Sequence, residues 1–350
     1  MSRYRSVIIG LSGIGANRPP EPEGLPIYGA VARSHTSAYH RCPDTELVAV
    51  CDLDDERRND CLERWKDVWP DLKGYTDYRE MFDVEKPDIV SVATSDHLHA
   101  DMVVEAAERK IPMIVCEKPI ATTLDDADRM IAAAEANGVL LSVEHSRRWH
   151  PSFLQARELI RGGELGEART VTTEMFSQRA MLFRNGTHAI DMMIFLAQGD
   201  PAWVTAQLED GFEHFTEYKS DGGHDPTTDP YVSAYVRFAN DVRGFVNFMK
   251  VDLPGSQWTV TCDGGRIEVS DRELKVVTGG SYREWSETPY PVDQYVHQHF
   301  GGFVPEIIHV HENGGGLVSP ATEARKTLEL MLGMLKSHEL GNSRVDFPLS

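Results

Sequence analysis

The first third of the chain alternates short apolar runs with stretches of helical periodicity. The spacing of apolar positions predicts helices over 54–69, 99–109 and 124–137, and Gly138 follows the last of them, where a helix end favours glycine. The repeated strand–helix–strand order predicts an α/β Rossmann domain, a doubly wound parallel sheet, over residues 1–150. Its buried parallel strands are predicted at the apolar runs bounded by Gly, Pro or Asp, which are 6–9, 47–51, 89–93, 113–116 and 139–143.

The pattern changes after about residue 151. A helix over 152–161 leads into segments of alternating apolar and polar residues, which predict an open, mainly antiparallel sheet. A short helix over 187–196 interrupts these segments, and a longer one over about 321–335 follows them. We therefore predict an α+β domain over 151–350. Its predicted strands are 168–175, 202–208, 231–238, 244–250, 258–262 and 266–269.

Composition narrows the classes of function. A chain of 350 residues exceeds one ordinary core, and 41% hydrophobic residues are enough for two. The 35 basic and 55 acidic residues give a net charge of -20, which repels nucleic acid and anionic membrane surfaces and excludes both as partners. No apolar run approaches the roughly 18 residues of a membrane span, and the chain opens on a strand rather than a signal peptide. We expect a cytoplasmic protein whose five cysteines, without metal-ligand spacing, are reduced structural thiols.

A glycine-rich turn follows the first predicted strand. It is the run from Gly10 to Gly15, "GLSGIG", which has the form of a dinucleotide-binding turn but is weak evidence alone. The second strand ends in Asp52, and a carboxylate at that place accepts both ribose hydroxyls of an adenosine and repels a 2'-phosphate. The two features together favour NAD over NADP as the cofactor.

The distance from this turn to Asp52 is longer than usual. The spacing from Gly15 to Asp52 is 37 residues, where about 20 is usual. The excess matches a Pro- and Gly-rich insertion over about 17–33. Two interpretations of the insertion remain open. It forms a surface arm, or it forms a lid that borders the cofactor, since it starts near the carboxyl end of the first strand, where ligands of such sheets bind.

Several spaced motifs resemble one family of oxidoreductases. They are "DIVSVATSDHLHADMVVEAAERKIPMIVCEKPIA" (88–121), "HSRRWHP" (145–151), "GELGEARTV" (163–171), "NGTHAID" (185–191) and the C-terminal "EARKTLELMLGMLKS" and "VDFPL". In this order they resemble the glucose-fructose oxidoreductase, inositol dehydrogenase and rhizopine catabolism (Gfo/Idh/MocA) family. The resemblance covers nearly the whole chain.

The resemblance implies where the cofactor binds. A Rossmann domain would be followed by a domain whose open sheet carries the substrate site on one face and often a dimer contact on the other. The peptide before Pro119 in the Glu-Lys-Pro turn resembles those that are cis. The cofactor-binding residues implied are Gly10, Ser12, Gly13, Ile14 and Gly15 at the pyrophosphate, Asp52 at the adenosine ribose, Thr94, Ser95 and His97 at the middle of the cofactor, Glu117 and Lys118 beside the nicotinamide, and Arg148.

The chemistry of alcohol oxidation supports two catalytic candidates. Hydride transfer from a carbinol carbon requires a base for the hydroxyl proton and a cation that stabilises the developing alkoxide. Lys118, at a strand's carboxyl end, suits the second task. His188 suits the first because histidine exchanges a proton near neutral pH. Asp191, three residues later on the same helical face, either orients His188 or binds substrate.

One residue departs from the family's pattern. The family usually has an aspartate four residues before the histidine, and this chain has Arg184. Two alternatives stay open: Arg184 clamps a carboxylate or phosphate of the substrate, or it turns away or pairs with an acidic neighbour. His145 and Arg147, at the domain junction, are further substrate-binding candidates, and Arg148 is assigned to the cofactor. One of the two arginines serves the cofactor or a hinge, and the other forms an ion pair.

No metal site is expected. The histidine pairs at 97 and 99, 297 and 299, and 309 and 311 have no carboxylate that completes a ligand triad. We predict an NAD-dependent oxidoreductase that acts on a secondary hydroxyl, or the matching ketone, of a sugar, cyclitol or sugar derivative. The alternatives are an NAD-binding sensor without turnover and a dihydrodiol-type dehydrogenase. The open sheet predicts a homodimer or homotetramer.

Overall fold

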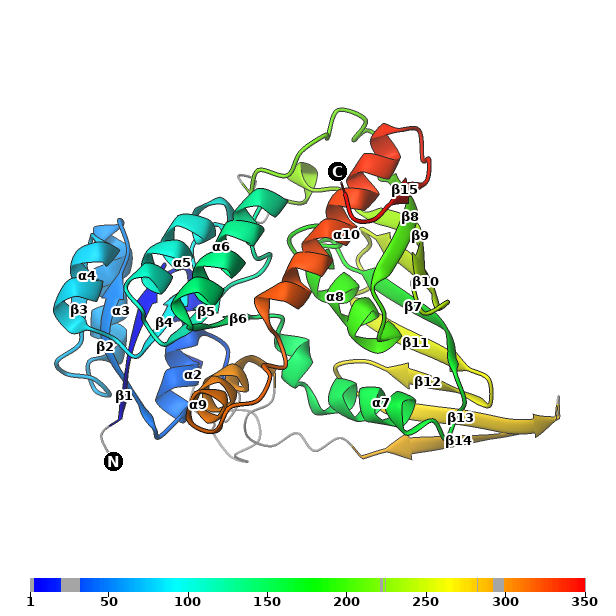
Figure 1. Ribbon diagram of the computed structural model, residues 1–350, viewed down its shortest axis with the longest axis horizontal. Helices are drawn as coiled ribbons and strands as arrows, with labels where there is room; N and C mark the ends of the chain where they lie inside the picture. The colour runs from blue at the N-terminus through cyan, green and yellow to red at the C-terminus, as the bar shows by residue number, and fades with distance from the viewer. Residues whose placement is uncertain are drawn as a thin grey trace. The chain divides into compact units, whose positions relative to one another are not determined.

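The chain divides into two compact units. The computed structural model describes residues 3–19, 32–220, 223, 225–281, 283–291 and 299–349 (Figure 1). Unit 1 comprises Met1–Trp149 and Gln294–Thr322, and unit 2 comprises His150–Asp293 and Glu323–Ser350. The sequence pattern predicts one boundary near residue 150, whereas the segment ending at Thr322 groups with the N-terminal unit.

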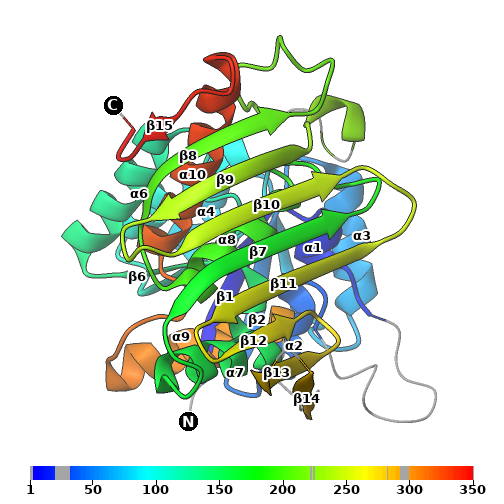
Figure 2. The ribbon, with the colours of Figure 1, turned by 90° about the vertical axis from the view of Figure 1, so that its right-hand side faces the viewer.

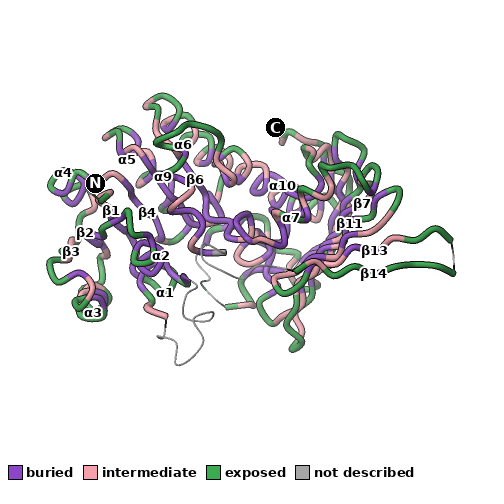
Figure 3. Tube along the Cα trace, turned by 90° about the horizontal axis from the view of Figure 1, so that it is seen from below, coloured by how far each residue is buried: buried purple, intermediate pink, exposed green. Residues whose placement is uncertain are grey.

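Unit 1 is built on a parallel sheet of six strands in the order β3-β2-β1-β4-β5-β6. This is the strand order of a dinucleotide-binding fold, and the predicted doubly wound sheet is confirmed. All residues of β4 and β5 are buried, as Figure 3 shows for β4, which is why both sequences are almost entirely apolar. The strands are β1 (Tyr4–Ile9), β2 (Thr45–Cys51), β3 (Lys73–Tyr75), β4 (Ile89–Val92), β5 (Met113–Cys116) and β6 (Leu140–Val143).

Helices cover both faces of this sheet (Figure 1). The first crossover is in two pieces, α1 and α2, which flank the predicted insertion; residues 20–31 of the insertion lie outside the described residues. The helices of unit 1 are α1 (Gly13–Ala16), α2 (His35–Arg41), α3 (Asp55–Trp65), α4 (Tyr78–Glu85), α5 (His99–Glu108), α6 (Leu124–Asn137) and α9 (Phe303–Asn313). Short 3-10 turns are η1 (Asp96–Leu98), η2 (Ser146–Trp149) and η4 (His299–Gly301).

A hydrophobic core joins the distant segments of unit 1. Tyr39 of α2 and Phe303 of α9 stack edge to face at a centroid distance of 6.3 Å, so helices far apart in sequence lie side by side (Figure 1). Both rings belong to a buried cluster that also contains Ile8, Trp149 and Ile307. This cluster explains why the segment that contains α9 belongs to unit 1.

Unit 2 contains a sheet of nine strands in the order β14-β13-β12-β11-β7-β10-β9-β8-β15. Every described pair is antiparallel except β7 with β10, and the predicted open, mainly antiparallel sheet is confirmed. The strands are β7 (Ala168–Phe176), β8 (Pro201–Leu208), β9 (Val232–Phe238), β10 (Arg243–Met249), β11 (Gly255–Cys262), β12 (Gly265–Val269), β13 (Leu274–Ser281), β14 (Glu284–Tyr290) and β15 (Val345–Asp346).

Helices pack on one face of the unit 2 sheet and leave the other open (Figure 2). The indole N–H of Trp258 in β11 donates to Ala189 O of α8 at 3.0 Å, and the Thr327 hydroxyl of α10 donates to Asp191 of α8 at 3.0 Å. These bonds tie sheet, inner helix and outer helix together. The helices are α7 (Pro151–Gly162), α8 (Gly186–Ala197) and α10 (Ala321–Glu339), with the 3-10 turn η3 (Pro226–Thr228).

All five cysteines are free and buried. Burial raises the pKa of the Cys51 thiol to about 12 and of the Cys61 thiol to about 11. Among the helices of the described ranges, none is long and apolar enough to cross a membrane.

Candidate active site

The glycine turn after β1 brings backbone close to backbone. Gly10 has φ +94°, and a Cβ there would lie 2.5 Å from Ala93 O; a Cβ on Gly15 would lie 2.0 Å from Gly10 O. Neither position accepts a side chain, so β1, β4 and α1 meet at van der Waals distance. The turn itself presents Ser12, Gly13 and Ile14, which are all exposed. An exposed turn at this edge, with Ser12 and Gly13 as its small residues, fits a pyrophosphate.

Asp52 lies directly after β2 and faces this turn. Its Oδ2 accepts the backbone N–H of Leu11 at 2.8 Å, and its Oδ1 accepts that of Asp54 at 3.0 Å. A carboxylate offers about four acceptor sites, so two remain for the hydroxyls of a ribose. The bonds fix the carboxylate beside the glycine turn, which is the position that an adenosine ribose requires.

The loop after β4 carries the next candidates. Thr94 is half-buried, whereas Ser95 and His97 are exposed. His99 is buried behind them, with Nε2 at 3.2 Å from Thr94 O and Nδ1 at 3.1 Å from Pro119 O. This ring links the loop after β4 to the loop after β5, so both loops hold one arrangement at the carboxyl edge of the sheet.

Lys118 follows β5 at the same edge of the sheet. Glu117 extends the β4–β5 ladder through its N–H to Val92 O at 2.9 Å, and the Lys118 N–H donates to Glu117 Oε2 at 3.2 Å. The Lys118–Pro119 peptide is cis, as expected. Glu117 is buried and Lys118 is half-buried. The backbone thus fixes where the ammonium side chain starts.

The loop after β6 holds three more candidates. His145 and Arg148 are buried, and Arg147 is half-buried. The Arg148 guanidinium donates to Val318 O at 3.0 Å, which ties this loop to the C-terminal part of unit 1. Arg148 therefore has a structural contact within the unit in addition to its predicted cofactor role.

Two further candidates, His188 and Asp191, lie on α8 of unit 2. His188 is half-buried in the first turn of the helix, and its backbone N–H donates to Asn185 O at 3.1 Å. Asp191 is fully buried and accepts the Thr327 hydroxyl on its Oδ1. The Asp191 carboxylate is therefore held by the outer helix α10.

Arg184 lies just before α8, beside a cavity of about 230 Å³. The buried Asp229 accepts the backbone N–H of Arg184 at 2.9 Å and that of Phe183 at 3.1 Å. Burial raises the pKa of the Asp229 carboxyl to about 6, although both backbone donors oppose the rise. Burial and the charge of Arg184 lower the pKa of Arg179, so two guanidinium groups lie near one another. The cavity is lined by His214, Tyr218, Lys219, Thr228 and others.

Three residues near these candidates escaped the sequence analysis: His35, Glu144 and Asp229. His35 and Asp229 lie in segments rich in turn formers and polar residues, where no pattern indicates burial. The position of Glu144 could have been predicted, because a charged residue directly after the buried run "LLSV" lies at the carboxyl edge of the sheet.

Within the described ranges, no group of three or more His, Cys, Asp or Glu side chains is arranged to hold a metal ion. Of the histidine pairs considered, His297 lies outside the described residues. His309 and His311 lie exposed on α9.

Two family models match the chain. Residues 27–145 match the model described as "Oxidoreductase family, NAD-binding Rossmann fold", and residues 153–268 match the "GFO/IDH/MocA C-terminal domain". The chain belongs to the Gfo/Idh/MocA family. The predicted family and its NAD-binding Rossmann domain are confirmed.

Three relatives illustrate the similarity. D-apiose dehydrogenase of Paraburkholderia graminis is 32% identical over 182 residues, which cover 48% of this chain and 47% of that protein. Inositol 2-dehydrogenase of Salmonella typhimurium is 28% identical over 164 residues, which cover 44% and 48%. The matched regions thus span about half the length of these curated relatives. Levoglucosan dehydrogenase in complex with NADH and levoglucosan has the same fold, with a TM-score of 0.78, 18% identity, and 99% and 100% of the two chains covered.

The place of Asp52 in this Gfo/Idh/MocA chain predicts the effect of removing its charge. We expect Asp52→Asn to raise the Kd for NAD about 10- to 100-fold, because a hydrogen bond to a charged group contributes roughly 1.5–3 kcal/mol. The Kd for NADP should change less, because the repulsion of its 2'-phosphate is removed at the same time. Fluorescence titration with both nucleotides measures the two values, with Asp60→Asn on α3 as the control. An unchanged preference would remove Asp52 from cofactor selection.

Proposed function

We propose that this chain is an NAD-dependent dehydrogenase that oxidises a secondary hydroxyl of a sugar, cyclitol or sugar derivative, or reduces the matching ketone. One observation carries the proposal: Lys118 follows β5 at the sheet edge where the glycine turn and Asp52 also lie. The Lys118 side chain therefore starts from the same edge as the residues that we propose to bind the nucleotide. Ligands of open α/β sheets bind outside this edge.

The residues divide the work of an alcohol oxidation. Gly10, Gly13 and Gly15 would hold the pyrophosphate of NAD and Asp52 its adenosine ribose. When bound, NAD supplies a hydride acceptor. The Lys118 ammonium holds the substrate oxygen and stabilises the negative charge that develops on it. His188 takes the hydroxyl proton in oxidation and returns it in reduction.

The names of relatives support a polyhydroxylated substrate. D-apiose, inositol and levoglucosan are the compounds named for the three similar proteins. All are small polyols or sugar derivatives with secondary hydroxyls. Arg184 beside its cavity favours testing acidic sugars as well, because a guanidinium pairs with carboxylate in a bidentate manner.

The deciding experiment is NAD reduction over a panel of pentoses, hexoses, inositols and sugar acids. The purified protein is first checked by mass spectrometry for retained nucleotide. An increase in reduced-nicotinamide absorbance with one substrate class supports the dehydrogenase. Tight NAD binding with no turnover across the panel contradicts it and favours the alternative of a sensor. Turnover of aromatic dihydrodiols alone would instead favour the dihydrodiol-type activity.

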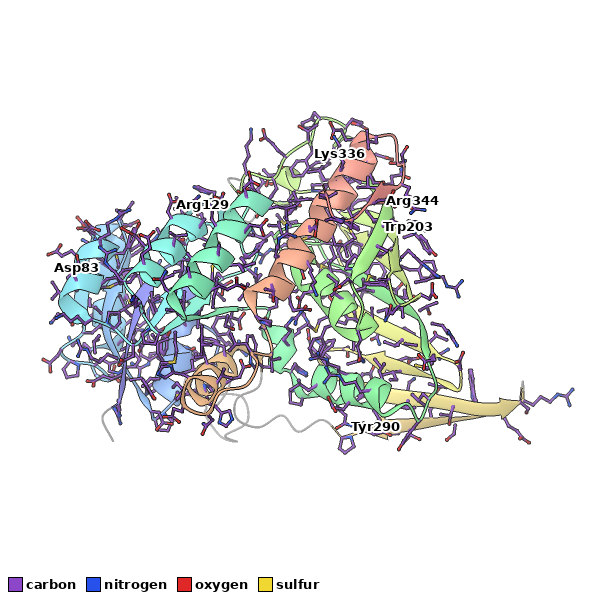
Figure 4. The ribbon with its side chains drawn as sticks, in the orientation of Figure 1. Asp83, Arg129, Trp203, Tyr290, Lys336 and Arg344 are labelled. Carbon is purple, nitrogen blue, oxygen red and sulfur yellow. The ribbon has the colours of Figure 1, made fainter. Side chains whose placement is uncertain are left out.

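We propose that the open face of the unit 2 sheet mediates self-association. Gly244 and Phe248 of β10 face α8, so the alternate residues Phe245 and Met249 point to the open face, where they are 39% and 44% exposed. Rings of β8 and β9 extend this surface. Its edge carries Arg344 over the ring of Trp203 at 4.6 Å, both labelled in Figure 4. Light scattering after gel filtration should give a dimer or tetramer mass, and a monomer mass would refute this role.

A further inference from the structure

A chain of buried polar groups leads to Glu117. Tyr39 OH lies 2.7 Å from Ser91 Oγ, Ser91 Oγ lies 2.9 Å from His35 Nδ1, and His35 Nε2 lies 3.1 Å from Glu117 Oε1. All four residues are at most 5% exposed. Their elements differ, since α2 supplies two of them, β4 the third and the turn after β5 the fourth. The fold therefore brings distant segments together behind the residue that precedes Lys118.

The directions of these hydrogen bonds follow from the acceptor at the end. A carboxylate only accepts, so the His35 Nε2–H donates to Glu117. In the neutral ring Nδ1 accepts, and the Ser91 hydroxyl donates to it. Ser91 Oγ then accepts from Tyr39, whose phenol burial keeps protonated by raising its pKa. Each donor has one acceptor, and the whole chain is directed at a negative charge on Glu117.

The His35 ring is fixed in this position. It packs against Phe300 and Phe303, with centroid distances of 5.2 Å to each. Ser34, the residue before His35, caps α2: its hydroxyl accepts the Ser37 N–H, and its own N–H donates to the Ser37 hydroxyl at 2.9 Å. The first residue of α2 is thus held by its helix cap and by its aromatic neighbours.

Glu144 lies beside Glu117 at the carboxyl edge of the sheet. Cys116 of β5 is opposite Val143 of β6, and the Glu144 N–H donates to Cys116 O at 2.8 Å. Glu117 and Glu144, which directly follow Cys116 and Val143, are therefore neighbours at the ends of adjacent strands. Glu144 is 1% exposed, and its Oε1 has no hydrogen-bond partner among the described residues. Two adjacent buried carboxyl groups do not both ionise at neutral pH.

The surroundings decide which carboxyl carries the charge. Burial alone would raise the pKa of Glu117, but the hydrogen bond from His35 and the charge of Lys118 hold that pKa below its ordinary value. Burial and the charge of Glu117 hold the pKa of Glu144 well above its ordinary value. The charges of Lys118 and Arg147 oppose this rise without cancelling it. Burial also raises the pKa of the neighbouring Cys116 thiol, and the negative charges of Glu117 and Asp96 raise it further.

We propose that Glu117 and Glu144 form an unequal carboxyl pair beside Lys118, in which Glu117 holds the negative charge and Glu144 holds the proton. The buried chain from Tyr39 makes Glu117 the charged member. Glu144 is neutral because one of its oxygens receives no donor that would support a charge. Glu117 and Glu144 are positioning residues, and their importance for turnover rests on the proposed function of Lys118.

The first test measures Lys118 in the cofactor-free protein. An amine-reactive reagent is applied at pH 7 to 8, and the modification rate of Lys118 is followed by peptide mass spectrometry, with exposed Lys86 as the internal reference. Glu117→Gln removes the adjacent negative charge and should speed the modification of Lys118 about tenfold, because an opposite charge nearby favours the unreactive ammonium form. Glu144→Gln replaces one neutral group by another and should change the rate less than twofold.

A second measurement identifies the proton directly. The infrared band of a buried protonated carboxyl group should be present in the wild-type protein at pH 7, persist in Glu117→Gln and disappear in Glu144→Gln. Equal labelling rates in the two variants, or a band that disappears with Glu117 instead, would overturn the assignment. Neither readout requires turnover. A Lys118 variant with wild-type turnover would therefore contradict the proposed function and leave the charge assignment intact.

Discussion

Replacing Lys118 by alanine is expected to lower kcat about a thousandfold while the Kd for NAD stays within a few-fold of the wild-type value. The ammonium acts where negative charge develops on the substrate oxygen, and removal of one such donor typically costs a factor of 10² to 10³. A full positive charge places the effect at the upper end of this range. Stopped-flow measurement of the first turnover, with saturating NAD, measures the step directly.

The separation of binding from chemistry has a structural basis. Lys118 follows β5, whereas the glycine turn follows β1 and Asp52 follows β2. The loss of one side chain at the β5 turn leaves the bonds of Asp52 to Leu11 and Asp54 in place. Nucleotide affinity should therefore survive a substitution that lowers kcat strongly.

The matched control is Lys66→Ala. Lys66 is the C-cap residue of α3, is exposed, and pairs with Glu63 of the same helix at 2.7 Å. Its loss should leave kcat unchanged, because exposed pairs of this kind contribute little. A Lys118→Ala variant with the kcat of this control would remove Lys118 from the mechanism.

Local patterns in the sequence were sufficient to predict which candidate residues lie at the carboxyl edge of the parallel sheet. Continuous apolar runs mark strands buried on both faces, and the residues that follow each run fall at one edge of a parallel sheet. Gly10, Asp52 and Lys118 all follow such runs, so their common edge could be predicted. Strand β3 could not, because its three residues, Lys73 to Tyr75, form no apolar run.

Long-range packing was beyond the sequence. No local signal indicates that α9 packs beside α2, because that contact depends on rings of Tyr39 and Phe303 more than 250 residues apart. The bond of Asp229 to the backbone before α8 likewise joins a polar loop to a distant helix start. The pairing of Glu117 with Glu144 lies between these cases, since it follows from strand order and register once the sheet is known.

The second large effect is expected at His188. We predict that His188→Asn lowers kcat/KM about 10²- to 10³-fold in the oxidation direction, because general-base assistance of this kind contributes roughly a factor of 10² to 10⁴. Asparagine keeps a polar side chain of similar reach but does not exchange a proton. His188 is half-buried in the first turn of α8, so the substitution changes no fully buried core position.

The pH dependence distinguishes a base from a structural histidine. Histidine changes its charge between pH 5 and 8, and only the neutral ring accepts a proton. In the wild-type enzyme kcat/KM for oxidation should therefore rise with pH over this window and then level off, and this rise should be absent in His188→Asn. The control is His309→Asn on the exposed side of α9, which should keep the wild-type profile. A variant that loses activity uniformly at every pH, with the rise retained, would show that His188 supports the fold rather than the proton transfer.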